Sequence, residues 1–192
     1  TDIIEEEIPG AEVAVLSGPS HAEEVGKGLP TTIVAGAHSR RTAEQIQEYF
    51  MSPVFRVYTS SDMLGIETGA ALKNVIALAA GMADGLGYGD NTKAALITRG
   101  IAEIARLGTA MGAHLETFYG LSGIGDLIVT CASVHSRNRK AGWLMGQGCT
   151  MKQAMEQVHM VVEGVYSARA GLELARKYQV EVPIIQRVNE IL

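Results

Sequence analysis

Aromatic residues and cysteines are scarce in this sequence of 192 residues. Phe, Trp and Tyr together make up 5% of it, so aliphatic side chains must fill the core, which favours closely packed helices. The two cysteines, Cys131 and Cys149, are too few for a disulfide framework and form no Cys-x-x-Cys motif. A reducing, cytoplasmic setting is therefore expected.

Long hydrophobic runs and an excess of basic residues are also absent. The longest apolar run, Val75 to Ala83, is far shorter than the ~20 residues of a membrane-spanning helix. The acidic first seven residues do not form a signal peptide. Sixteen Lys and Arg against 21 Asp and Glu give a net charge of −5, which argues against nucleic acid or a membrane surface as the partner.

Several catalytic and binding motifs are missing. The sequence has no G-x-S-x-G of a hydrolase and no G-x-G-x-x-G fingerprint after a first strand. The five histidines lack a metal-binding spacing such as H-x-x-x-H, so no metal site is expected. The missing fingerprint, and a sheet of only three predicted strands, predict that the chain is part of a longer protein.

The first 60 residues predict alternating strands and helices. Short apolar or β-branched runs predict strands over 12–17, 31–36 and 54–58. Helices are predicted between them, from Ser20 to Gly28 with Ser20 as N-cap, and from Ser39 to about Phe50. This order predicts βαβ units and a mainly parallel sheet.

From residue 61 to 192 the pattern is almost entirely helical. The fold class is therefore α/β followed by all-α, with an incomplete first domain over 1–60 and a helical domain over 61–192. Asp90 or Asn91 is the expected N-cap of the second long helix. The expected helices cover about 62–85, 91–112, 123–131, 136–146, 151–157 and 163–178, and a last one begins at Pro183.

Lys73 is a candidate proton donor. It lies in an otherwise apolar helix beside Asn74, and such surroundings disfavour a charged lysine, which suits proton transfer. The alternative is a lysine that extends to water. Asp126 and Thr130 are four residues apart and share a helical face, where they could hold an ammonium or a hydroxyl. The alternative for Asp126 is simple helix capping.

The stretch from Ser136 to Lys140 is the only dense basic segment. It opens a predicted helix, so free backbone N–H groups, the helix dipole and the guanidinium of Arg137 all favour a phosphate. The alternative is a solvated cationic face.

Five motifs in this order resemble the bacterial NAD(P)-dependent glycerol-3-phosphate dehydrogenase family over essentially the whole chain. They occupy residues 18–22 (GPSHA), 72–75 (LKNV), 85–95 (GLGYGDNTKAA), 123–127 (GIGDL) and 136–138 (SRN). The resemblance implies a Rossmann domain that binds the nicotinamide cofactor and a helical domain like that of 6-phosphogluconate dehydrogenase. It also implies that a glycine fingerprint, a further substrate-contacting lysine and the last helical residues of the family are not in this chain. Ala70 stands where the family often has Gly.

The resemblance further implies the roles of individual residues. Lys73 becomes the general acid/base that exchanges a proton with the substrate oxygen, with Asn74, Asp126 and Thr130 as its catalytic neighbours. The residues implied in substrate binding are Gly18, Ser20, Lys73, Asp126, Ser136, Arg137 and Asn138. The residues implied near the NAD(P) cofactor are Ala22, Arg137, Val161 and Glu163.

The implied reaction interconverts sn-glycerol 3-phosphate and dihydroxyacetone phosphate in the cytoplasm and supplies glycerophospholipid synthesis. The resemblance allows a homodimer. Without the fingerprint, the chain alone is expected to be inactive. Two other hypotheses stay open: a non-catalytic helical binding or oligomerisation module, and a related dehydrogenase for another hydroxy acid.

Overall fold

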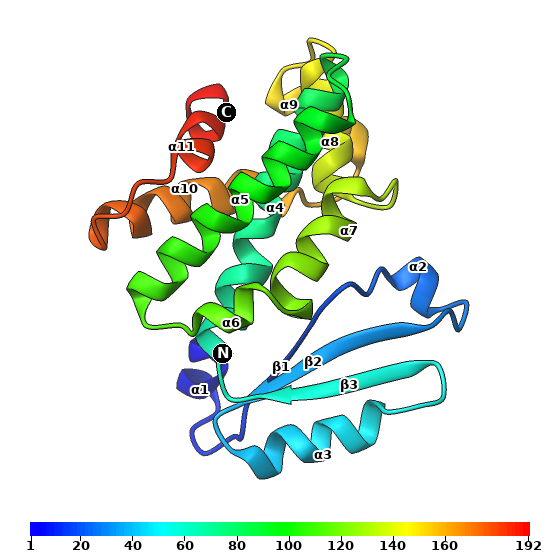
Figure 1. The fold of residues 1–192 in the computed structure, drawn as a ribbon, viewed down its shortest axis with the longest axis vertical. Helices are drawn as coiled ribbons and strands as arrows, with labels where there is room; N and C mark the ends of the chain where they lie inside the picture. The colour runs from blue at the N-terminus through cyan, green and yellow to red at the C-terminus, as the bar shows by residue number, and fades with distance from the viewer.

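The computed structural model describes residues 1–192, and it places a small sheet beneath a larger group of helices (Figure 1). The N-terminal part contains α1 (Asp2–Glu7), β1 (Ala14–Ser17), α2 (Ala22–Val25), β2 (Thr31–Ala37), α3 (Arg40–Phe50) and β3 (Phe55–Ser60). The helical part contains α4 (Met63–Gly85), α5 (Asp90–Met111), α6 (Leu115–Phe118), the π-helical turn η1 (Leu121–Gly125), α7 (Asp126–Ala132), α8 (Arg137–Gly146), α9 (Met151–Val158), α10 (Glu163–Lys177) and α11 (Pro183–Ile191). The order of a sheet followed by helices confirms the expected fold class.

The sheet has the strand order β1-β2-β3. Strands β2 and β3 are parallel, as expected, with α3 as the crossover packed against both (Figure 1). Strand β1 is antiparallel to β2, so the expectation of a parallel first unit is wrong. The connection over residues 18–30 is long enough for a parallel crossover, but α2 is a single turn between Pro19 and Pro30, too short to pack across the sheet as a crossover helix.

Helix starts follow the capping chemistry at some positions and not at others. Ser39 caps α3 by accepting a hydrogen bond from Thr42 N, as expected. Ser20 does not cap α2, because its hydroxyl donates to Gly18 O, and α2 begins after His21. Gly89, rather than Asp90 or Asn91, precedes α5. The short helices α1 and α6 were not expected from the pattern.

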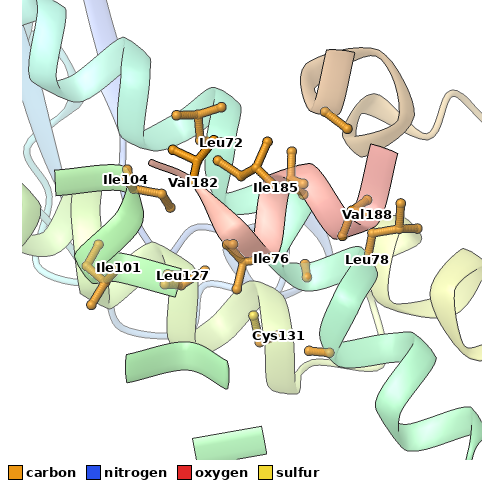
Figure 2. Packing of buried hydrophobic residues seen from close by; sticks show 14 of the residues in the cluster. Leu72, Ile76, Leu78, Ile101, Ile104, Leu127, Cys131, Val182, Ile185 and Val188 are labelled. Atoms are coloured by element: carbon orange, nitrogen blue, oxygen red, sulfur yellow. The ribbon is translucent and has the colours of Figure 1, made fainter. Parts of the chain in front are cut away.

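Helix α4 lies at the centre of the helical part and packs against α5, α7, α8, α10 and α11. It is long and apolar enough to span a membrane by length and composition, but 61% of its apolar window is buried inside the fold. A central core helix shows the same combination. Its side chains Leu72, Ile76 and Leu78 join those of the surrounding helices in a cluster of 25 buried residues (Figure 2).

Candidate active site

A polar cleft of about 270 Å³ lies between the sheet part and the helical part. Its walls come from the end of β1, from α4, from α7 and α8, and from the start of α10. Ten of the twelve residues implied by the family resemblance line it. They are Gly18, Ser20, Lys73, Asn74, Asp126, Thr130, Ser136, Arg137, Asn138 and Glu163.

Lys73 and Asp126 form an ion pair in the floor of this cleft. Lys73 Nζ donates to Asp126 Oδ2 at 2.5 Å, and the two side chains are 20% and 5% exposed. Thr130 Oγ1 donates to Asp126 O at 2.6 Å and contacts Asp126 Oδ1 at 3.2 Å. The ammonium of Lys73 therefore ends at a carboxylate within the cleft and not in bulk water. Asp126 makes no side-chain cap of α7 and pairs with the lysine instead. Lys73 remains partly open to the cleft, where an ammonium can give a proton to a bound oxygen.

The π-helical turn η1 brings Asp126 to Lys73. The sequence predicted one helix from Gly123, but the chain makes a wide turn over Leu121–Gly125 before α7 starts at Asp126. Close backbone packing requires glycine here: a Cβ on Gly69 would lie 3.0 Å from Ser122 O, and one on Gly123 would lie 2.2 Å from Phe118 O. Gly69 therefore lets η1 rest on α4, and Gly123 lets it pack against the end of α6, which together fix the carboxylate against the lysine.

Asn138 holds three helices together behind the cleft. Its Nδ2 donates to Asn74 Oδ1 at 2.9 Å, and its Oδ1 accepts from Gly164 N at 2.8 Å. Asn74 Nδ2 donates back to Ala70 O at 3.2 Å. Asn138 is only 4% exposed, and through these contacts it orients Asn74 on α4 while it also lines the cleft.

Arg137 and Glu163 form a second ion pair at the rim. Arg137 Nη2 donates to Glu163 Oε1 at 2.5 Å, and both side chains are 38% exposed. Ser136 caps α8 by accepting from Arg139 N at 3.2 Å. A guanidinium has five N–H donors, so Arg137 keeps donors for an anion while it contacts Glu163. The N–H groups in the first turn of α8 that lack a hydrogen-bond partner within the helix also favour an anion at this rim.

Two of the residues implied near the cofactor lie outside the cleft lining, namely Ala22 and Val161. Both are exposed, and Val161 is 60% exposed in the segment before α10. The structure does not bring them into contact with the lysine pair.

Two histidines that sequence reasoning assigned no role do line the cleft, namely His21 and His135. Their ring centroids are 5.9 Å apart, and His21 Nε2 is buried with no hydrogen-bond partner. Their positions in the sequence could have revealed them, because His21 lies inside the GPSHA motif and His135 directly precedes Ser136.

A nicotinamide dinucleotide fits this chain at one end only. The cleft offers the arginine, amide and imidazole groups that can face a reacting ring and its substrate. No glycine-rich loop between a strand and a helix is present to receive a pyrophosphate. The residues here therefore fit the reacting end of the cofactor, not its phosphates.

Comparisons with known proteins agree with this arrangement. Residues 62–192 match the family model for the C-terminus of NAD-dependent glycerol-3-phosphate dehydrogenase, and residues 1–43 match its N-terminus. Over all 192 residues the chain is 69% identical to a glycerol-3-phosphate dehydrogenase [NAD(P)+] of Agathobacter rectalis, and it covers 57% of that protein. A Fusobacterium nucleatum relative of the same name is 66% identical, with all of this chain and 58% of the relative covered.

Solved structures show the same fold. The crystal structure of glycerol-3-phosphate dehydrogenase from Coxiella burnetii superposes with a TM-score of 0.96 at 38% identity, and covers all of this chain and 59% of that one. The Saccharomyces cerevisiae enzyme gives a TM-score of 0.86 at 29% identity, over 99% of this chain and 58% of that one. These matches place the chain among nicotinamide-dependent dehydrogenases with a helical second part. It belongs to the NAD-dependent glycerol-3-phosphate dehydrogenase family. The chain spans somewhat more than half the length of these relatives.

Proposed function

We propose that this chain carries the substrate-binding and proton-transfer part of an oxidoreductase that interconverts sn-glycerol 3-phosphate and dihydroxyacetone phosphate with NAD(P)(H). The observation that carries the proposal is the Lys73–Asp126 pair in the floor of a polar cleft, with Arg137 and the start of α8 at its rim. The printed names of the relatives support the same reaction.

Lys73 moves the proton of the reaction. In the direction of reduction, its Nζ gives a proton to the carbonyl oxygen of dihydroxyacetone phosphate, and in the reverse direction it takes the proton from the hydroxyl. A bound nicotinamide would supply or receive the hydride at the carbon that bears this oxygen. Asp126 holds the ammonium in place, Thr130 in turn donates to Asp126, and Asn74 orients the substrate hydroxyl next to the ammonium.

Arg137 holds the phosphate of the substrate. A guanidinium at the N-terminus of a helix offers a fork of donors beside free backbone N–H groups, and this combination suits a phosphate. Ser136 contributes its hydroxyl from the N-cap position, and Gly18 and Ser20 close the cleft from the end of β1. Only a phosphorylated substrate uses this rim, which disfavours a related dehydrogenase for another hydroxy acid.

On the cofactor side we assign Ala22, Arg137, Val161 and Glu163 to the border of the nicotinamide end.

The proposed division of the chain is a sheet part over 1–60 and a catalytic helical part over 61–192. The proposed setting is the cytoplasm, where the product would supply glycerophospholipid synthesis, and the proposed assembly is a homodimer. Size-exclusion chromatography with light scattering tests the assembly.

Kinetics of Arg137 variants test the proposed substrate, in a full-length dehydrogenase that carries this chain. Arg137→Ala should lower kcat/KM for glycerol 3-phosphate by the equivalent of about 2–5 kcal/mol, because a desolvated phosphate loses its partner. Arg137→Lys should recover only part of the loss, since an ammonium cannot reproduce the fork. Glycerol, which lacks the phosphate, should be affected much less.

The matched control is Arg169→Ala. Arg169 is an exposed arginine on α10 that also pairs with a glutamate, Glu173, but it lies away from the cleft. This variant should leave both substrates unchanged. An equal loss for glycerol 3-phosphate and glycerol in Arg137→Ala would contradict the phosphate assignment.

A further inference from the structure

The fixed charges that line the cleft cancel. Lys73 pairs with Asp126, and Arg137 pairs with Glu163, so the four charged side chains of the lining sum to zero. A phosphate monoester brings a charge of about −1.5 to −2 at neutral pH. The ion pairs alone therefore leave such a ligand without a compensating positive charge.

The remaining titratable side chains of the lining are His21 and His135. They approach from opposite walls: His21 precedes α2 on the sheet side, and His135 lies in the loop that leads into α8. Their ring centroids are 5.9 Å apart, and the rings are inclined at 59°. Both line the same cleft as Ser136 and Arg137, where the proposed phosphate would bind.

The ring of His21 also has an unfilled hydrogen bond. Its Nε2 is buried and has no partner, whereas nearly all buried polar atoms in proteins have one. Because His21 itself lines the cleft, a turn of its ring would bring this atom to a ligand oxygen.

We propose that His21 and His135 are the charge-compensating part of the phosphate site: they take up protons as a phosphate monoester binds, and hold its oxygens opposite Arg137. The inference rests on the proposed function and adds a pH-dependent recognition element to it. No bond is made or broken; protons pass from solvent to imidazole nitrogens.

Coulomb forces couple the protons to the anion. Two imidazolium rings this close repel each other, and a bound phosphate dianion that contacts both rings outweighs this repulsion by its attraction to each of them. Imidazoles exchange protons between about pH 5 and 8, so this coupling acts near neutrality.

The other charged groups near the pair do not change this reasoning. Glu23 and Glu24, which follow His21 on α2, and Lys140 on α8 are exposed and do not line the cleft, so their charges reach the ligand only through screened, longer-range forces. Arg139 is bound by Asp84 on the far side of α8 from the rim arginine, at 2.7 Å. The lining charges themselves are paired as described above.

Calorimetry on residues 1–192 with sn-glycerol 3-phosphate tests the inference. Titrations between about pH 7 and 8.5 keep the phosphate mostly dianionic, so changes report protein groups. Two buffers with different ionisation enthalpies give the number of protons taken up. We expect Kd to rise about fivefold or more over this range, and about one proton to be taken up per ligand at the lower pH.

The double variant His21→Gln with His135→Gln separates charge from hydrogen bonding, because glutamine can fill the bond but cannot be protonated. It should bind at least about fivefold more weakly than the wild type near pH 7, take up no proton, and match the wild type near pH 8.5. The control His38→Gln removes an exposed histidine outside the cleft and should behave like the wild type throughout. Equal weakening of the double variant at every pH would show a structural role and overturn the inference.

The remaining outcomes distinguish the inference from the proposed function. Binding that is weakened by Arg137→Ala but is independent of pH and of both histidines would overturn the inference and leave the proposed function standing. No binding of glycerol 3-phosphate by the wild type would overturn both. Proton uptake with NADH instead of glycerol 3-phosphate would show that the pair faces the cofactor, and would also overturn the inference.

Discussion

Lys73 and Cys131 both lie among the helices, but only the surroundings of Lys73 allow its side chain to react with a ligand. Lys73 has a carboxylate partner 2.5 Å away and an opening to the cleft. Cys131 is completely buried in the apolar cluster around α4, and burial raises the pKa of its thiol to about 12 (Figure 2). A thiolate is the reactive form of cysteine, so Cys131 has a packing role and no chemical one.

Thiol titration checks this contrast. In the folded chain, a disulfide reagent such as dithionitrobenzoate should modify Cys149, which is partly exposed, and leave Cys131 unmodified. Both thiols should react in denaturant, and the variant Cys131→Ser should lose only the thiol that denaturant releases. Two thiols that react at similar rates in the folded chain would contradict the described packing.

Helices α4 and α8 cross at a contact that only glycine permits. A Cβ on Gly81 would lie 2.1 Å from Arg139 O, and one on Gly142 would lie 2.0 Å from Leu78 O. Gly85 and Gly146 repeat the contact one turn further along each helix. The close approach matters for the cleft, because Asn138 at the start of α8 must reach Asn74 on α4.

The variant Gly142→Ala tests this crossing. Alanine favours a helix over glycine by up to about 1 kcal/mol, but the methyl group would overlap a backbone carbonyl that cannot move by itself. We expect a net loss of about 1–3 kcal/mol in the free energy of unfolding, measured by urea denaturation. Gly125→Ala is the control, since its backbone is helical and its added Cβ would come no closer than 3.6 Å to any neighbouring atom. A Gly142→Ala protein as stable as the wild type would contradict the packing.

Asp62 connects the sheet part to the helical part. It follows β3 and caps α4, where its Oδ1 accepts from Gly65 N at 3.0 Å. Its Oδ2 accepts from His114 N at 2.9 Å and from Thr117 Oγ1 at 2.5 Å, in and before α6. Burial by itself raises the pKa of Asp62, but the hydrogen bonds from Thr117, Gly65 and His114 outweigh it, so the pKa lies below its ordinary value of 3.8.

The stability of the whole chain should therefore depend on the charge of Asp62. A carboxyl group with a lowered pKa in the folded state stabilises it above its unfolded pKa, and this contribution is lost as the pH falls through the folded pKa. Asp62→Asn keeps an oxygen for Gly65 but cannot accept from both other donors. We expect a loss of about 1.5–3 kcal/mol at neutral pH, shrinking below the ordinary value of 3.8.

Urea denaturation of both proteins as a function of pH gives this difference directly. Asp90→Asn, at an exposed carboxylate, is the control. The pKa of Glu103 is shifted in the opposite direction, because burial raises it more than the hydrogen bonds from Ile184 N and Ile185 N lower it. The contribution of Glu103 to stability is therefore lost as the pH rises through its pKa in the folded state. Because Glu103 is present in every protein compared, it cancels in the difference. A constant difference at all pH values would contradict the role of Asp62.

The sequence pattern predicted most of the helices, the pattern together with the family resemblance named most of the residues that line the cleft, and the failures have physical causes. Lys73 and Asp126 could be singled out because a lysine in an apolar helix and a carboxylate near a helix start are local signals. The pairing of His21 with His135 could not, because it depends on how the sheet part sits on the helical part. The antiparallel β1 escaped prediction because its connection to β2 forms only a single helical turn, and the turn η1 escaped prediction because it depends on close backbone packing.

The central claim is that Lys73 transfers the proton in a cleft built from both parts of the chain. The direct measurement is kcat of a full-length dehydrogenase that carries this chain, compared with its Lys73→Ala variant, with NADH affinity measured in parallel. The variant should lose about 10²–10⁴ in kcat, the usual share of general acid–base catalysis, and keep its affinity for NADH. Lys140→Ala, at an exposed lysine of α8, should keep normal kcat. A folded Lys73→Ala enzyme with near-normal kcat would contradict the account.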